Sequence, residues 1–321
     1  MLKRIILLGA DEGQAAAAEK MKENMGNKGS EGCSSDSYDA DKSRLLGDAV
    51  LEGILDWKNG CGIVDCGNGI LPVVEVIERE ECAGDGLLFL TDSSLVLQNL
   101  KRMGMYAAAW LHENNREEDL SGAIYAVTEI EELDWESLEK IYLRLAGKPW
   151  TVMETERCII REMTVEDVEA FYRIYAEPSI TRYMEDLFPE KEEEIEYTKN
   201  YIEKIYGFYG YGLWSIVCKE NQEVIGRAGL SWREGFDTPE LGFVIGVPYQ
   251  RKGYAYEVCK AIVAYGKEEL GFEKIQALVR EGNRASVCLC RKLGFRQEGR
   301  VEDKGVWYER YVNGKKRISD F

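Results

Sequence analysis

The sequence predicts an α/β protein with two domains. Its 321 residues are long for one domain, which favours two. Through residues 1–148, short apolar runs alternate with helical patterns, as in a Rossmann-like domain with a parallel sheet. Residues 149–155 indicate a linker, and the pattern changes in residues 156–321, where strands come as hairpin pairs. We therefore expect a Rossmann-like α/β unit followed by a separate sheet domain.

Composition and charge exclude several classes of protein. The formal net charge is −17, whereas nucleic-acid-binding proteins usually carry a basic face. No apolar run approaches the roughly eighteen residues that a membrane span needs. The nine cysteines are odd in number and scattered, and neither the pair Cys61 and Cys66 nor His112 has the further partners of a zinc site. We expect no metal, nucleic-acid or membrane partner, reduced thiols and a cytoplasmic location.

The N-terminal pattern predicts alternating strands and helices. The strands are expected over residues 2–9, 62–66, 86–93, 106–111 and 124–127, and the helices over residues 13–25, 45–55, 95–104, 119–123 and 134–146. Residues 26–42 contain almost no large apolar side chain and predict a loop. The segment 72–79 fits either a helix start or an extended stretch.

Residues 88–145 resemble the back half of a haloacid dehalogenase-like (HAD-like) domain, in which an acidic strand tip precedes a helix. The family's D-x-D nucleophile motif has no copy, because Asp11 and Asp65 lack a partner aspartate. The tip residue Asp92 is either a remnant of an acidic metal motif or, as we favour, a surface cap of the helix that starts at Ser93. The resemblance implies a degenerate domain in which phosphatase chemistry is in doubt.

The C-terminal pattern predicts a sheet with helices inserted between its strands. Strands are expected over residues 155–164, 213–218, 224–230, 240–245 and 274–279, with two closing strands beside 303–305. Helices are expected from Thr164, over 190–206 and over 283–293, and a loop over 207–212. Six aromatic residues either line an acceptor cleft or belong to the core: Tyr206, Phe208, Tyr209, Tyr211, Trp214 and Trp232.

Residues 244–257 carry the clearest chemistry. An apolar strand ends at Pro248, which cannot donate to a sheet ladder. Two cations, Arg251 and Lys252, and the small residue Gly253 then open a helix. Unpaired N–H groups and the helix dipole favour an anion at such a helix end, and small residues let it approach the main chain. The stretch predicts a phosphate or diphosphate cradle.

The loop pattern Gln-x-x-Gly-x-Ala at residues 250, 253 and 255 resembles the acetyl-CoA pyrophosphate loop of the GCN5-related N-acetyltransferase (GNAT) family. It matches neither the dinucleotide fingerprint nor a P-loop. Further family patterns extend the resemblance over nearly all of residues 156–318: R-x-x-I-R-x-M-T-x-x-D from Arg157, I-G-x-x-G-L from Ile225 and N-x-x-S from Asn283. The ribosomal-protein N-acetyltransferase branch is the most similar. The resemblance implies a GNAT fold, with a mixed, mostly antiparallel, splayed sheet, and acetyl-CoA as cofactor.

The resemblance assigns the cofactor site residue by residue. The main chain of Val247 is expected to pair with the pantetheine arm, and Asn283 and Ser286 to contact it from the next helix. The diphosphate is expected to lie on six consecutive loop residues, Gln250, Arg251, Lys252, Gly253, Tyr254 and Ala255.

Glu240 and Cys290 are the candidate catalytic residues. An alkyl amine has a pKa of about 10 and attacks only in its neutral form, so a base is required. Glu240 stands at the position of the family's water-binding glutamate; a solvated carboxylate at a strand end is an equally good interpretation. Cys290 stands where many members carry a tyrosine acid, and its thiol is either a proton donor or a buried filler. The general acid stays unassigned.

The expected activity is transfer of the acetyl group of acetyl-CoA to a primary amine, by direct attack through a tetrahedral intermediate. A protein or peptide α-amine is the preferred acceptor, and a small-molecule amine is the second choice. Two alternatives remain open: a non-catalytic acyl-CoA sensor that recruits a partner, and a bifunctional protein with phosphatase activity in residues 1–148.

Overall fold

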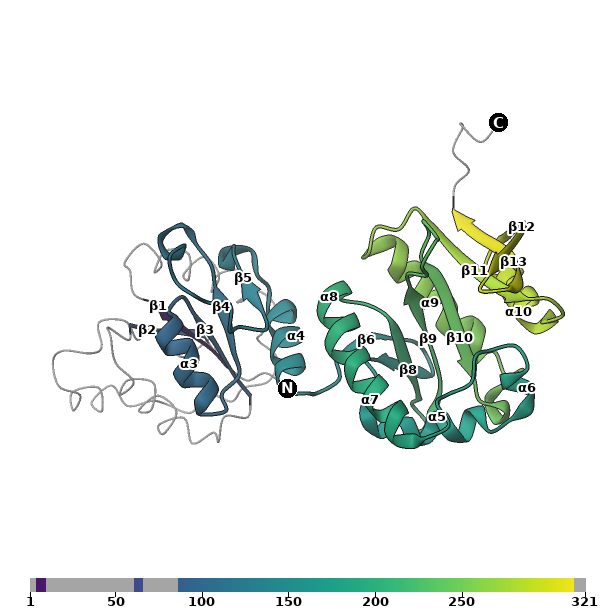
Figure 1. The fold of residues 1–321 in the computed structure, drawn as a ribbon, viewed down its shortest axis with the longest axis horizontal. Coiled ribbons are helices and arrows are strands. Elements are labelled where there is room, and N and C mark those ends of the chain that lie inside the picture. Colours follow the sequence, from purple (N-terminus) through teal and green to yellow (C-terminus); the bar gives the residue numbers. More distant parts are fainter. Residues whose placement is uncertain (1–3, 10–60, 66–85, 315–321) are drawn as a thin grey trace, which may run out of the picture. The chain divides into compact units, whose positions relative to one another are not determined.

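The chain divides into two compact units, Met1–Lys148 and Pro149–Phe321 (Figure 1). The computed structural model describes residues 4–9, 61–65 and 86–314. Four expected segments lie outside these ranges: the helices over 13–25 and 45–55, the loop over 26–42 and the segment 72–79.

The first unit contains a five-stranded parallel sheet with the order β2-β1-β3-β4-β5. Its strands are β1 (Arg4–Gly9), β2 (Cys61–Asp65), β3 (Leu87–Thr91), β4 (Ala107–Trp110) and β5 (Ala126–Val127). All residues of β3 and β4 are buried, as expected for parallel strands that are covered on both faces.

Helices α3 (Ser94–Arg102) and α4 (Trp135–Leu145) pack against opposite faces of this sheet. Leu87 and Phe89 share one core cluster with Leu97 of α3. The alternate residues Leu88 and Leu90 share another cluster with residues of α4, including Leu138 and Tyr142. Because side chains alternate along a strand, this division places one helix on each face, which is the doubly wound arrangement.

Two local expectations for this unit are wrong. Residues 119–123 form a turn and not a helix, because the Asp119 carboxylate accepts hydrogen bonds from the main chain and hydroxyl of Ser121. Asp92 is buried and does not cap α3; its Oδ2 lies 3.2 Å from Nε2 of His112, while Glu118 accepts the hydrogen bond from the main chain of Ser94. The sequence pattern missed the contacts of Asp92 with His112 and of Ser94 with Glu118 because they join residues 20 and 24 positions apart.

The second unit contains an eight-stranded sheet with the order β12-β13-β11-β10-β9-β8-β7-β6. Its strands are β6 (Thr151–Glu154), β7 (Cys158–Arg161), β8 (Leu213–Cys218), β9 (Val224–Ser231), β10 (Glu240–Ile245), β11 (Lys274–Arg280), β12 (Arg296–Asp303) and β13 (Val306–Gly314). Within this sheet β10 and β11 run parallel, and the other neighbours are antiparallel. The expected mixed, mostly antiparallel sheet is confirmed.

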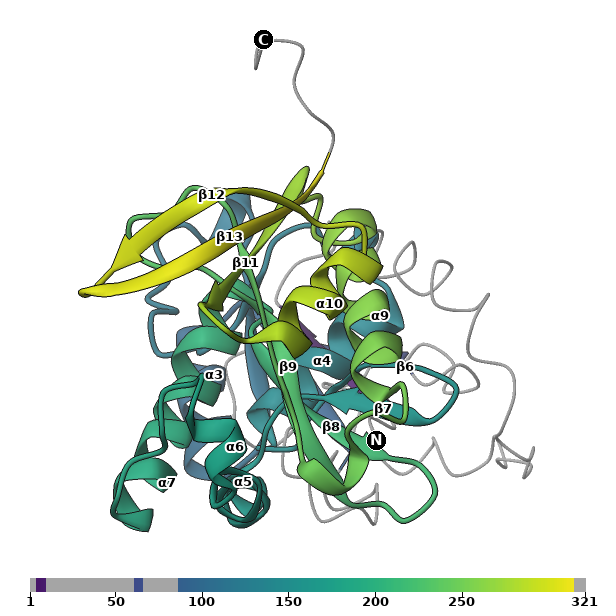
Figure 2. The same cartoon turned by 90° about the vertical axis from the view of Figure 1, so that its right-hand side faces the viewer.

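Helices cover both faces of this sheet (Figure 2). On one face lie α5 (Val168–Tyr175), α6 (Pro178–Thr181) and α7 (Lys191–Tyr201), and on the other lie α9 (Tyr254–Glu268) and α10 (Arg284–Lys292). Strand β9 shows the division, since Arg227 contacts the rings of Phe171 and Tyr175 on α5. Leu230, on the opposite face of β9, lies beside Gly266 of α9.

Two stretches of the second unit differ from the expected elements. The expected linker 149–155 contains strand β6, which pairs with β7 as a hairpin. Pro149 suggested a break, but the following residues Thr151 to Glu154 find a partner strand. The expected loop 207–212 begins as helix: α7 continues through a π-helical segment, Ile202–Tyr206, into α8 (Gly207–Tyr209).

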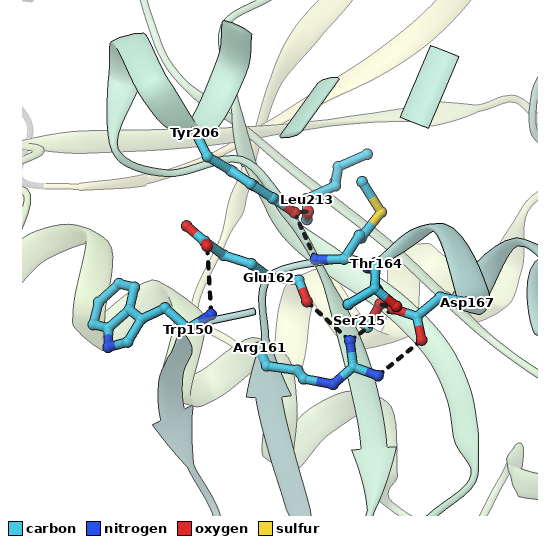
Figure 3. A network of polar contacts seen from close by, with 9 residues as sticks. Trp150, Arg161, Glu162, Thr164, Asp167, Tyr206, Leu213 and Ser215 are labelled. Carbon is cyan, nitrogen blue, oxygen red and sulfur yellow. Dashed lines mark hydrogen bonds and ion pairs between the residues drawn. The ribbon is translucent and has the colours of Figure 1, made fainter. Parts of the chain in front are cut away.

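A buried polar network ties the start of α5 to the sheet (Figure 3). Arg161 on β7 donates two hydrogen bonds to Asp167, at 2.7 and 2.8 Å, and the hydroxyl of Ser215 on β8 donates to the same carboxylate at 2.6 Å. The main chain of Thr164 also donates to Asp167, which closes a capping box. The R-x-M-T-x-x-D pattern is therefore explained by structure: the arginine and the aspartate fix the turn between β7 and α5.

We expect Asp167→Asn to destabilise the second unit by about 3 kcal/mol, because it removes the charge that pairs with Arg161 in a mostly buried network. Differential scanning calorimetry of the full chain measures the effect. Glu113→Gln, which breaks an exposed ion pair with Arg116, is the matched control and should leave the transitions in place. An unchanged transition for Asp167→Asn would contradict the structural role of this network.

Candidate functional site

The site is built on the parallel pair β10 and β11, which part along their length. In the described sheet their ladder has one register pair, Glu240 with Gln276, and the main chain of Gln276 donates to Pro239 at 2.9 Å. Beyond Glu240, β10 stays paired with β9 as far as Ile245. The side of β10 that faces β11 therefore has no strand partner there among the described residues. A gap of this kind offers main-chain groups to an extended ligand, as an added strand would.

The loop after β10 contains a tight turn followed by two left-handed residues. A 3₁₀ turn, Val247–Tyr249, follows the strand, and Nε2 of the Gln250 side chain donates back to the carbonyl of Ile245 at 2.8 Å. Arg251 has φ 57° and Gly253, the N-cap of α9, has φ 90°. Gly253 carries no side chain that could cap the helix. The loop thus delivers an uncapped helix N-terminus beside the gap between β10 and β11.

The main-chain N–H groups of residues 251–256 have no acceptor recorded within the described part of the chain. Those of Tyr254 to Tyr256 belong to the first turn of α9, whose N–H groups cannot pair inside the helix. The side chains of Arg251 and Lys252 are exposed next to them. We call residues 250–256 the cradle. Free N–H groups, the positive end of a helix dipole and two cations make it suited to a diphosphate.

The other expected cofactor residues lie at the ends of the same two strands. Val247 is exposed, and its carbonyl accepts from the main chain of Gln250 while its N–H has no acceptor recorded among the described residues. Asn283 is the N-cap of α10, directly after β11, and its Oδ1 accepts from the main chain of Ser286 at 3.2 Å. Because β10 and β11 are parallel, both helix N-termini lie at their carboxyl ends, where ligands of open α/β sheets bind.

Glu240 lies where the two strands begin to part. Its carboxylate lies 3.1 Å from Nη1 of Arg233, on the connection between β9 and β10. Arg233 also binds Asp303 at 2.7 Å. Burial raises the pKa of Glu240, and the charge of Arg233 acts in the opposite direction. A carboxyl with a raised pKa beside an open gap has the chemistry of a general base.

Cys290 does not fit the role of proton donor. Its side chain is completely buried on α10, beside Cys259 of α9, and burial raises the pKa of its thiol to about 12. A thiol enclosed between two helices has no path to a reacting group at the sheet gap. The structure supports the alternative interpretation, a buried filler.

The six aromatic residues do not form one group. Tyr206 and Trp214 are core residues with no exposure, and Tyr211 is buried, whereas Phe208 is 81% exposed on α8 and Tyr209 and Trp232 are also exposed. The hydroxyl of Tyr206 joins the network of Figure 3 by binding Met163 and Leu213. Of the two interpretations, the core applies to Tyr206, Tyr211 and Trp214.

Sequence reasoning missed three residues at this site. Arg233 binds Glu240, and a charged pair across the short β9–β10 connection was the available signal. Gln276 is fully buried opposite Glu240; its Nε2 donates to Thr238, and its Oε1 has no partner among the described residues. Arg157 opens the R-x-x-I-R pattern, but its contact with Lys252 of the cradle, 95 residues later, has no local signal in the sequence.

No helix in the described ranges is long and apolar enough to cross a membrane. The same ranges contain no cluster of three or more histidine, cysteine or acidic side chains that could hold a metal ion.

Comparison with known proteins identifies a family and several relatives that the second unit resembles. Residues 157–296 match the family described as "Acetyltransferase (GNAT) domain". The "Uncharacterized N-acetyltransferase YoaA" of Bacillus subtilis (strain 168) is 33% identical over 154 residues, which are 46% of this chain and 84% of that protein. The "Putative ribosomal N-acetyltransferase YdaF" of the same organism is 31% identical over 75 residues, 23% of this chain and 38% of that protein.

Among solved structures, an acetyltransferase (GNAT family) from Bacillus anthracis is similar with a TM-score of 0.42 and 24% identity, over 50% of this chain and 95% of that one. These matches give no support for the HAD-like resemblance of residues 88–145.

Proposed function

The chain belongs to the GNAT family of acetyltransferases and is an enzyme of the acyltransferase class, and we propose that it transfers the acetyl group of acetyl-CoA to a primary amine. The observation that supports this proposal is the row of N–H groups at residues 251–256, which have no acceptor among the described residues and lie at the same edge of the sheet as the gap between β10 and β11. A coenzyme A thioester carries a diphosphate for the first feature and an amide-bearing arm for the second.

The residues present fit such a cofactor. Arg251 and Lys252 would balance the charge of the diphosphate, and the main chain from Gly253 to Tyr256 would bind its oxygens. The N–H of Val247 and the side of β10 that faces β11, which have no partner in the described part of the chain, would receive the amides of the pantetheine arm. Asn283 and Ser286, at the N-terminus of α10, would close the other wall.

Glu240 would act as the base of the transfer. The amine nitrogen forms a bond to the acetyl carbon, the bond from that carbon to sulfur breaks, and the nitrogen loses a proton. The Glu240 carboxylate, held by Arg233, accepts that proton directly or through a water. The departing sulfur leaves as thiolate, which needs no proton from Cys290.

A protein or peptide α-amine is the proposed acceptor class, and a small-molecule amine is the second choice. The resemblance of the C-terminal half to the ribosomal-protein branch supports this order, as does the printed name of the relative YdaF, a putative ribosomal N-acetyltransferase.

Thiol release tests the proposal. The full chain is incubated with acetyl-CoA and a panel of peptides with free α-amines, diamines and monoamines, and free coenzyme A is measured with a thiol reagent. We expect release that depends on the acceptor and is fastest with one peptide class. Matched peptides with a blocked α-amine are the control. Tight binding of acetyl-CoA without turnover on any acceptor would instead indicate a sensor.

A further inference from the structure

Arg157 approaches the cradle from the segment before β7. Its Nη1 donates to the main-chain carbonyl of Lys252 at 3.0 Å, and its guanidinium lies 4.2 Å from the centre of the Tyr254 ring. A Cβ added at Gly253 would lie 3.3 Å from Nη2 of the same arginine. One side chain therefore contacts three consecutive cradle residues, through a carbonyl, a ring and a close approach to glycine. None of these contacts uses an N–H group of the cradle.

The same arginine binds both carboxylate oxygens of Glu257, in the first turn of α9. The main chain of Arg157 donates to Oε1 at 2.9 Å and its Nε to Oε2 at 2.7 Å, with Nη2 at 2.6 Å from Oε2. Burial acts to raise the pKa of Glu257, but hydrogen bonds from Thr155 and Arg157 outweigh it and the pKa is lowered. Glu257 is therefore a full carboxylate at neutral pH.

A carboxylate at this position can weaken the binding of an anion at the cradle. It carries the same sign as a diphosphate, and a free carboxylate near an uncapped helix N-terminus is itself a ligand for the N–H groups there. Gly253 offers no side chain that could occupy those groups first. The contacts of Arg157 hold both oxygens of Glu257 and add a positive charge whose side chain is 39% exposed.

We propose that Arg157 is a positioning residue for cofactor binding: by holding Glu257 and the carbonyl of Lys252, it keeps the N–H groups of the cradle free for a diphosphate. This inference rests on the proposed function, because it assigns a role in binding a coenzyme A thioester. It makes no claim that Arg157 touches the acetyl group or the acceptor.

The test compares three variants of the full chain by titration calorimetry with acetyl-CoA. Arg157→Ala should raise the dissociation constant on the order of tenfold, because Glu257 stays ionised but loses the guanidinium that holds Oε2 and balances its charge, and keeps only the main-chain hydrogen bond to Oε1. Glu257→Gln alone should change it by less than about threefold, because the neutral amide neither repels nor competes strongly. The double variant should bind within about threefold of the unmodified chain, because the Glu257 carboxylate that would interfere is removed together with the Arg157 side chain that holds it. Arg116→Ala, which removes an exposed arginine of the first unit, is the matched control.

Kinetics separate positioning from general damage to the fold. For Arg157→Ala we expect KM for acetyl-CoA to rise in step with the dissociation constant while kcat changes less than about twofold. If Arg157→Ala lowers the unfolding midpoint of the second unit, Arg157→Lys is measured in its place. Its dissociation constant should lie between those of the unmodified chain and Arg157→Ala. Unchanged affinity in Arg157→Ala, or a double variant as weak as the single one, overturns the inference. Absence of acetyl-CoA binding by the unmodified chain removes the proposed function itself, and the inference with it.

Discussion

A Gly253→Glu variant should bind acetyl-CoA at least tenfold more weakly, a loss of about 1.4 kcal/mol or more. Three effects act in the same direction. Gly253 has φ 90°, a conformation that L-residues adopt only with strain, so the loop would shift. The new Cβ would press on Nη2 of Arg157 at 3.3 Å. The new carboxylate would also place negative charge at the helix end that the diphosphate is proposed to occupy.

A matched control separates the effect of the Gly253 position from the general effect of replacing a glycine by glutamate. Gly271, in the connection between α9 and β11, also has a positive φ, 69°, and has open space where a Cβ would go. Gly271→Glu therefore carries a similar backbone cost and the same added charge at the other end of α9. We expect it to lower the unfolding midpoint by a similar amount and leave the affinity unchanged. Equal dissociation constants for Gly253→Glu and the unmodified chain, measured by calorimetry, would disprove the cradle.

The cradle could be predicted from the sequence because its determinants are local. Pro248 ends the strand, Gly253 permits the left-handed residue, and the helical pattern follows at once. The strand and helix order of residues 213–293 is predictable for the same reason: alternation and capping residues act over a few positions. The bounds found for β8 and β10 equal the expected ones, residues 213–218 and 240–245.

The parts that could not be predicted depend on contacts between distant segments. Cys290 lies on a helix whose position against α9 decides that its thiol is buried beside Cys259. Arg157 and Glu257 lie a hundred positions apart, and nothing near either residue indicates the other. Strand β6 follows a proline that suggested a linker, and it exists because β7 offers an edge. In each case packing across the sheet decided what the local pattern left open.

Glu240 also combines a local feature, which the sequence predicts, with contacts between distant segments, which it does not. The position of Glu240 at the start of β10 was predictable, but its ion pair with Arg233 and its place opposite the buried Gln276 of β11 depend on tertiary contacts. These contacts also support a structural interpretation, in which the carboxylate closes the ladder between β10 and β11 and anchors Arg233. A substitution that keeps the shape of the side chain and removes only its basicity is needed to separate the two roles.

Glu240→Gln should lower kcat/KM at neutral pH by roughly 100-fold or more, the usual contribution of a general base. The pH profile gives the sharper readout. In the unmodified chain the working form is the carboxylate, so the rate should rise with pH through the pKa of Glu240. Because burial raises that pKa, the rise should lie above the value of about 4.3 for an ordinary glutamate. In Glu240→Gln this rise disappears, and the rate should climb only toward the pKa of the acceptor amine, about 10 for an alkyl amine.

Glu302→Gln is the control, since it removes an exposed carboxylate from β12, one residue before Asp303. It should leave the profile unchanged, whereas a general electrostatic effect of lost negative charge would shift both variants alike. The glutamine can still accept a hydrogen bond from Arg233, and Arg233 keeps Asp303 as its ion partner. We therefore expect an unfolding midpoint close to that of the unmodified chain. If Glu240→Gln lowers this midpoint and leaves the pH profile intact, the carboxylate stabilises the sheet and is not the general base. The base must then be another group along the gap between β10 and β11.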